Sequence, residues 1–255
     1  MSAGAGNQGV PTAPPQPWTP PAAAVGVAIG LLVWLTLDVV LDGPWHQADL
    51  ALADWVDTVD LRGMTAPNAV LWLLTQTGGR GTILVVIGAL TLYVMRQRRV
   101  WQPLLRVVVT LALLTVVVYA LKVGLGRTAP GSGDSILYVD GLSYPSGHSA
   151  NAVLWWGTAV WLVRTYRMPG WLVRACTAMA VAAPILTTIS MIALNYHWLT
   201  DVVAGLALGL VLLWLVNLLF GTRLGQWGNA PKPEGLFGRG RGRTRELVLR
   251  PGARG

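Results

Sequence analysis

Apolar residues are grouped along this chain in long runs rather than in short alternating stretches. Six such runs stand out, at about residues 23–41, 82–95, 103–121, 149–163, 171–190 and 202–220. A helix needs about 20 apolar residues to cross a bilayer, and it satisfies its backbone polar groups internally. A membrane barrel would need shorter segments of alternating polarity. The pattern therefore predicts an all-α fold, a polytopic membrane helical bundle of about six transmembrane helices.

The second run is short for a bilayer. An earlier start near Leu71, with a break at the Gly-Gly-Arg-Gly of residues 78–81, would give it the length of a span. Between the first two runs, residues 49–56 mix aspartates with apolar side chains. This stretch fits a short interfacial helix with an acidic face. It fits equally well a solvated loop anchored by Trp55.

The two ends of the chain differ in composition from the apolar middle. Residues 1–21 carry no charged side chain and are rich in proline, alanine and glycine, so we expect a disordered leader rather than a signal peptide. Residues 222–255 contain a Gly-Arg repeat and predict a basic disordered tail. Residues 22–221 would then form the transmembrane domain.

Composition and charge support a membrane protein. The chain is 53% hydrophobic and 12% charged, whereas soluble domains carry about 25% charged residues. Its net charge of +8 comes from basic residues in short loops and in the tail, which favours anionic lipid as the partner over nucleic acid. Cys176 is the single cysteine, so the chain can form neither an internal disulfide nor a cysteine metal site.

The distribution of arginines predicts the topology. Most arginines lie in the tail or in the loops that follow the second and fourth runs, among them Arg96, Arg98, Arg99, Arg164, Arg167 and Arg174. The positive-inside rule places such loops in the cytoplasm. We therefore expect an integral protein of a bacterial plasma membrane with both termini cytoplasmic. The loops after the first, third and fifth spans would face outward.

Two of the three histidines lie at the outer ends of predicted spans. His148 precedes the fourth span, and His197 precedes the sixth, four residues before Asp201. A neutral histidine can attack phosphorus, and a second, protonated one can protonate the leaving oxygen. Spacing of four residues in a helix would let the carboxylate orient His197 and stabilise its cation. The third histidine, His46, has no recognisable context.

The same outer face offers groups that bind anions. Lys122 and Arg127 follow the third span, and Ser146 and Gly147 precede a helix whose N-terminus favours anions. Taken singly, each of these residues could be a snorkelling anchor or a cap. Their gathering at one membrane depth, on the side where cations are disfavoured, predicts a phosphate site. No metal-ligand spacing is present, and we expect no cofactor.

The motifs of this region resemble those of the type 2 phosphatidic acid phosphatase family, which is related to the vanadium haloperoxidases. That family carries Lys-x6-Arg-Pro, Pro-Ser-Gly-His and Ser-Arg-x5-His-x3-Asp in this order. The second motif is intact at residues 145–148, and the third keeps Ser190, His197 and Asp201. The first begins at Lys122, but Ala129 stands at its arginine position, and Met191 stands at the arginine position of the third.

The resemblance implies a phosphatase that acts on a lipid phosphate or an isoprenyl diphosphate at the extracytoplasmic face, without a metal. By resemblance, His197 is the nucleophile that forms a phosphohistidine, His148 the acid, Asp201 the partner of His197, and Lys122 a phosphate ligand. Arg127 could substitute for a missing arginine. Loss of the two arginines favours one alternative, a lipid-phosphate binder without turnover. A second alternative is a lipid phosphotransferase, in which an alcohol takes the phosphoryl group instead of water.

Overall fold

The computed structural model describes residues 19–132 and 135–221, and every regular element in these ranges is helical. The helices are α1 (Ala22–Val40), α2 (Pro44–Val59), α3 (Thr65–Thr75), α4 (Arg80–Arg98), α5 (Gln102–Leu125), α6 (Gly147–Thr165), α7 (Gly170–Ala193) and α8 (Leu199–Gly221), with a 3-10 turn at Pro130–Ser132. The predicted all-α polytopic bundle is confirmed. The tail and all but residues 19–21 of the leader lie outside the described residues.

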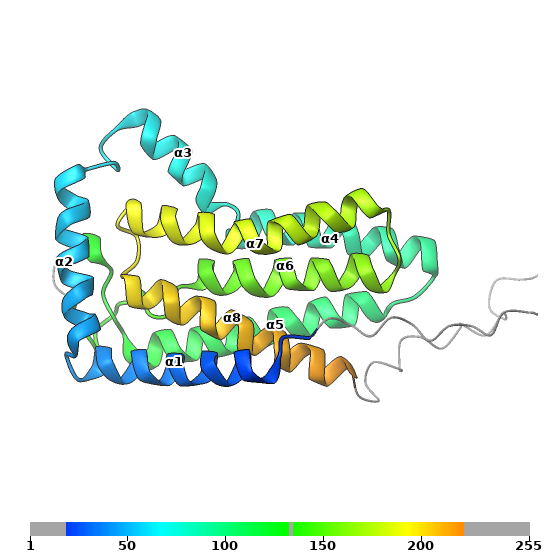
Figure 1. Ribbon diagram of the computed structural model, residues 1–255, viewed down its shortest axis with the longest axis horizontal. Helices are drawn as coiled ribbons and strands as arrows, with labels where there is room; N and C mark the ends of the chain where they lie inside the picture. Colours follow the sequence, from blue (N-terminus) through cyan, green and yellow to red (C-terminus); the bar gives the residue numbers. More distant parts are fainter. Residues whose placement is uncertain (1–18, 133–134, 222–255) are drawn as a thin grey trace, which may run out of the picture.

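The long helices run side by side along the bundle (Figure 1). By length and composition, α1, α5, α7 and α8 could each cross a membrane, and α3 with α4, which are bent by 42° at their junction, could together form a fifth span or a re-entrant loop. The remaining long helix, α6, packs against α4, α5, α7 and α8 and is buried along most of its length. Because neighbouring helices shield it from lipid, α6 can carry the polar residues of a site.

Helix α2 lies across one end of the bundle rather than along it (Figure 1). It contains residues 49–56, so the helical alternative for this stretch is correct. Its start is tied to α1, because the backbone N–H of His46 donates to the Asp38 carboxylate at 2.8 Å. Only part of its acidic face meets solvent, since Asp54 is exposed whereas Asp49 is buried.

The predicted break in the second span is present between α3 and α4. The span begins at Thr65, earlier than Leu71, and α4 starts at Arg80. Gly78 lets this break lie directly on the neighbouring helices. A Cβ at Gly78 would be 2.5 Å from the carbonyl oxygen of His148 and 2.8 Å from the Thr187 side chain. The break is therefore packed against the first turn of α6.

Close contact between α6 and α8 brings the site residues together. A Cβ added to Gly205 of α8 would collide with the carbonyl oxygen of Ser146, and one at Gly209 would lie 2.8 Å from that of Ala150. The backbone N–H of Ser146 also donates to the carbonyl oxygen of Asp201 at 2.9 Å. The start of α6 is therefore held beside the start of α8.

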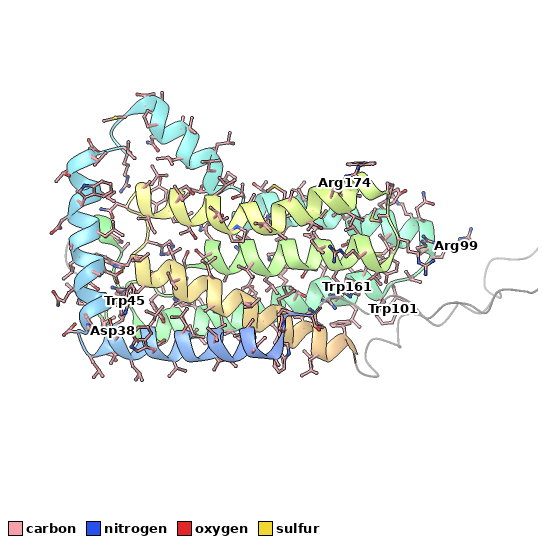
Figure 2. All side chains as sticks on the ribbon, viewed as in Figure 1. Asp38, Trp45, Arg99, Trp101, Trp161 and Arg174 are labelled. Carbon is pink, nitrogen blue, oxygen red and sulfur yellow. The ribbon has the colours of Figure 1, made fainter. Side chains whose placement is uncertain are left out.

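The two ends of the bundle carry different side chains. Arg99, Trp101 and Arg174 lie at one end, and Asp38 and Trp45 lie at the other, next to α2 (Figure 2). Helix α1 begins, and α8 ends, toward the end that carries the arginines (Figure 1). The loops that hold the predicted site are consequently at the end that α2 covers.

Candidate active site

His197 and Asp201 are in contact, as their spacing predicted. The Nδ1 atom of His197 lies 3.2 Å from Oδ2 of Asp201. Helix α8 starts only at Leu199, so the contact does not come from a shared helical face. Asp201 instead folds back over the first turn, where its Oδ2 also accepts the backbone N–H of Trp198 at 3.2 Å. This fixes the carboxylate in front of the imidazole.

Ser143, from the loop before α6, completes this contact. Its hydroxyl donates to Oδ2 of Asp201 and lies 3.2 Å from Nδ1 of His197. With Nδ1 facing these two oxygens, Nε2 is the ring nitrogen that is left for chemistry. The tautomer in which Nδ1 carries the proton is the one that this arrangement favours.

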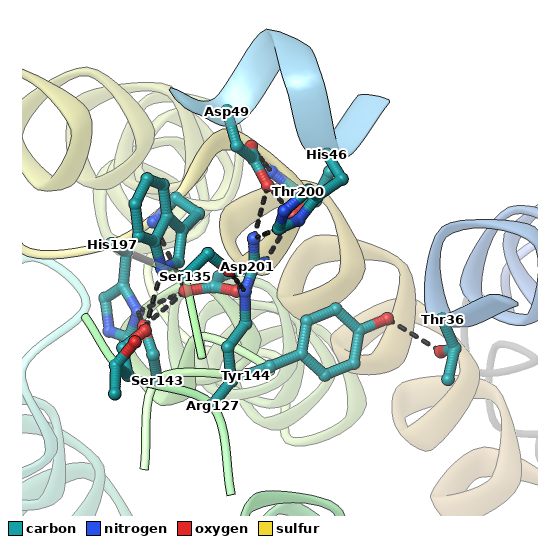
Figure 3. A network of polar contacts seen from close by, with 12 residues as sticks. Thr36, His46, Asp49, Arg127, Ser135, Ser143, Tyr144, His197, Thr200 and Asp201 are labelled. Atoms are coloured by element: carbon teal, nitrogen blue, oxygen red, sulfur yellow. Dashed lines mark hydrogen bonds and ion pairs between the residues drawn. The ribbon is translucent and has the colours of Figure 1, made fainter. Parts of the chain in front are cut away.

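Arg127 holds the other side of Asp201 (Figure 3). Its guanidinium is fully buried and forms ion pairs of 2.7 Å with Oδ1 of Asp201 and with Oδ2 of Asp49. It also donates to the hydroxyl of Thr200 at 2.7 Å and to that of Ser135 at 2.9 Å. The donors of Arg127 are thus directed at protein groups.

Asp49 links α2 to the start of α8. Its Oδ1 accepts the backbone N–H of Thr200 at 2.9 Å, and its Oδ2 accepts the Thr200 hydroxyl. Burial raises the pKa of the Asp49 carboxyl, against the opposing effects of the Arg127 charge and of the hydrogen bonds from Thr200. The carboxyl therefore depends on Arg127 and Thr200 to remain charged out of water.

A cavity of about 530 Å³ lies on the other side of His197. It is lined by Arg80, Lys122, Ala129, Leu142, Ser143, Gly147, His148, Asn151, Tyr196 and His197. Two imidazoles, one guanidinium and one lysine amine thus converge on one space. Asn151 is buried there, and its Oδ1 has no hydrogen-bond partner among the described residues. A cavity of this kind fits a polyanionic group that brings its own hydrogen-bonding atoms.

The sequence-predicted residues divide between this cavity and its wall. His197, His148, Lys122 and Gly147 line it, and the Lys122 ammonium also donates to the carbonyl oxygens of Leu142 and Ser143. The N–H groups of Gly147 and His148 belong to the first turn of α6, which leaves them without intrahelical partners.

The other three predicted residues lie behind the cavity. Ser146 is fully buried and caps α6 by accepting the N–H of Ser149 at 3.4 Å. Asp201 and Arg127 do not line the cavity either and act on it through His197. Arg127 is therefore placed for holding Asp201 rather than for touching a ligand.

Sequence reasoning missed Arg80, Asn151, Ser143 and Asp49. Arg80 carried one available signal, because it is an ionisable side chain at the break within a predicted span, and such residues are often functional. Asn151 lies one helical turn after His148 on α6, which places both on one face. Ser143 and Asp49 belong to no motif and reach the site only through the tertiary fold.

The fold and this site define a polytopic integral membrane protein with a cavity lined by two histidines at one end of its bundle. Residues 103–224 match the family model of the PAP2 superfamily. This match places a PAP2-superfamily region at residues 103–224, which confirms the resemblance seen in the motifs.

Comparison with solved structures agrees with this match at the level of the fold. The chain is similar to a transmembrane PAP2-type phosphatidylglycerolphosphate phosphatase from Bacillus subtilis, with a TM-score of 0.59 and 24% sequence identity. The match covers 74% of this chain and 93% of that one. No curated protein matches the chain.

Proposed function

We propose that this membrane protein hydrolyses a lipid phosphate or an isoprenyl diphosphate through a phosphohistidine intermediate on His197. The observation that carries the proposal is the cavity where His197, His148 and Lys122 meet, with the His197 ring held on Asp201. The match to the PAP2 superfamily and likeness to a membrane phosphatidylglycerolphosphate phosphatase support a phosphatase of lipid phosphates.

In the first step, Nε2 of His197 attacks the phosphorus. A bond forms between nitrogen and phosphorus while the bond from phosphorus to the leaving oxygen breaks. The ring becomes cationic, and the Asp201 carboxylate at 3.2 Å stabilises that charge. Asp201 accepts bonds from Arg127, Ser143 and the Trp198 N–H, which hold its two oxygens in fixed directions.

His148 handles the protons in both steps. In the first, its protonated ring gives a proton to the leaving oxygen. In the second, the neutral ring takes a proton from water as the water oxygen attacks the phosphohistidine, and inorganic phosphate leaves with His197 restored. Lys122 and the N–H groups at the start of α6 bind the non-bridging oxygens during both steps.

The placement of the cavity suggests how a lipid reaches it. The cavity is at the end of the bundle opposite the arginine-rich loops. Because the positive-inside rule assigns those loops to the cytoplasm, the cavity would face the extracytoplasmic side. A head group would enter there while its chains stay in the bilayer. Cytoplasmic termini, anionic lipid at the basic tail and a bacterial plasma membrane remain parts of the proposal.

The test is phosphate release from a panel of lipid phosphates and diphosphates in detergent micelles with chelator present. We expect release by the wild-type protein, a loss of about 10²–10⁴-fold in His148→Ala, and no measurable release from His197→Ala. Arg174→Ala, an exposed change at the opposite end, is the control and should match the wild type.

A radiolabelled lipid phosphate separates hydrolysis from the alternatives. Label should be trapped on the wild-type protein as an acid-labile phosphoramidate and should be absent from His197→Ala. Folded protein that binds lipid phosphate without release would contradict the hydrolase and favour a binder. Release that requires an added alcohol, with transfer of label to it, would instead identify a phosphotransferase.

A further inference from the structure

The cavity lacks the guanidinium groups that the family pattern would supply. Ala129, at the arginine position of the first motif, lines the cavity with a methyl group. Met191, at the arginine position of the third, is buried in α7 and does not line it. Arg127 is turned toward Asp201, Asp49 and hydroxyl groups. A phosphate in the cavity would therefore meet no arginine from these motifs.

A different arginine lines the same space. Arg80, the first residue of α4, borders the cavity together with Lys122, His148 and His197. Its charge acts electrostatically on both Lys122 and His148. The side chain is exposed, and within residues 19–132 and 135–221 its guanidinium makes no hydrogen bond or ion pair.

We propose that Arg80 binds the substrate phosphate in this chain, in place of the motif arginine whose position is Ala129. The inference rests on the proposed function, because it assigns a ligand for the phosphate of that same site. A guanidinium presents two parallel N–H groups to two phosphate oxygens, which a lysine cannot do. Arg80 and Lys122 together would neutralise two negative charges of the bound phosphate.

The packing of the break between α3 and α4 fixes the backbone position of Arg80. The indole N–H of Trp156 donates to the carbonyl oxygen of Thr77 at 2.9 Å, and the hydroxyls of Thr77 and Thr187 are 3.0 Å apart. Gly78 also packs directly against the backbone of His148. Helices α6 and α7 thus hold the break through three contacts at two consecutive residues, Thr77 and Gly78. The backbone at Arg80 is preorganised beside His148.

Helix stability does not account for a cation at this position. The N-terminus of a helix carries partial positive charge, so an arginine in the first turn of α4 is repelled by the helix itself. Topology does not account for it either, because Arg80 lies at the bend between α3 and α4 and not in a cytoplasmic loop, where the positive-inside rule would favour an arginine. Both unfavourable features become favourable when an anion is bound, because the phosphate then contacts the guanidinium and the positively polarised end of α4 together.

The test compares Arg80→Ala with the wild type in the phosphate-release assay and in binding of inorganic phosphate, measured by thermal shift of the detergent-solubilised protein. Loss of a charge-assisted hydrogen bond predicts a fall in kcat/KM of about 10–100-fold. We expect phosphate affinity to fall by a similar factor. Arg80→Lys keeps the charge without the fork and should lie between the two.

A second variant tests directly whether Arg80 replaces the motif arginine at position 129. Ala129→Arg in the Arg80→Ala background returns the motif arginine to the cavity and should recover most of the lost kcat/KM and phosphate affinity. Unchanged phosphate affinity and kcat/KM in Arg80→Ala would overturn the proposal.

The binding arm keeps the two proposals distinguishable. If wild-type protein releases no phosphate from any lipid, the hydrolase fails, while loss of inorganic phosphate binding in Arg80→Ala would still support Arg80 as the ligand. Arg174→Ala is the matched control for removal of an exposed arginine and should leave both readouts unchanged.

Discussion

Two fully buried arginines lie at opposite ends of the bundle, and their guanidinium groups have different partners. Arg127, beside the cavity, pairs with the carboxylates of Asp49 and Asp201. Arg106, in the first half of α5, has no carboxylate partner among the described residues. It donates instead to the side-chain oxygen of Asn217, and its guanidinium carbon lies 3.9 Å from the centre of the Trp161 ring.

This difference in partners indicates the role of each buried charge. A buried charge carries a large desolvation cost, which a carboxylate can offset and an amide or an aromatic ring offsets only in part. Around Arg127 the two aspartates come from α2 and α8, so the ion pairs join two elements and orient the carboxylate that faces His197. Around Arg106 the partners come from α8 and α6, and none of them lines the cavity. We therefore expect function to depend on Arg127 and to tolerate change at Arg106.

The largest effect is expected from Arg127→Met. The change leaves the Asp49 and Asp201 carboxylates buried without their cation, which typically costs about 3–5 kcal/mol in the free energy of unfolding. Because burial already raises the pKa of Asp49, this carboxyl will take up a proton and limit part of the loss. Unfolding in detergent would give the stability, and phosphate release should fall to background.

A matched variant separates the charge from the hydrogen-bond geometry. Arg127→Lys keeps a cation but cannot bridge two carboxylates while also reaching Thr200 and Ser135. It should recover some stability and little activity. Wild-type phosphate release by Arg127→Lys would show that the fork of Arg127 does not position Asp201.

A smaller effect is expected from Asp49→Asn. The amide oxygen can still accept a bond from Thr200, and Asp201 still pairs with Arg127, so the change removes only the ion pair of Asp49 with Arg127 and weakens the bonds from Thr200. We expect a loss of about 1–3 kcal/mol in the free energy of unfolding. Phosphate release should fall by less than in Arg127→Met. A stability equal to that of Arg127→Met would mean that the α2 contact, not the pair with Asp201, dominates the cluster.

The sequence predicted the bundle well because the bilayer imposes a simple rule. A long apolar run has few alternatives to a helix, so α1, α5, α7 and α8 begin and end within a few residues of their runs. The mixed polarity of residues 49–56 allowed either a helix or a loop. The choice is made by tertiary contacts, since α2 is fastened by Asp38 at its start and by Asp49 in its middle.

The site was predictable only where residues fall in motifs. His148, His197 and Lys122 meet in the cavity because their motifs follow or precede spans at the same end. The role of Arg127 was not predictable, since its spacing from Lys122 does not reveal that two aspartates enclose it. The role of Arg80 was not predicted for a different reason. The break at residues 78–81 was predicted, but the sequence did not specify the direction of the 42° bend or the packing of Gly78 against α6 that bring Arg80 to the cavity.

The smallest effect is expected from Arg106→Met, the same substitution at the other buried arginine. Removing this cation leaves the Asn217 side-chain oxygen and the Trp161 ring without it, but it also removes a charge that burial disfavours. Since the two contributions oppose each other, we expect a change within about 2 kcal/mol in the free energy of unfolding. Phosphate release should equal that of the wild type. A loss as large as that of Arg127→Met would mean that amide and aromatic contacts compensate a buried charge here as fully as carboxylates do. The comparison between the two arginines would then rest on their distance from the cavity alone.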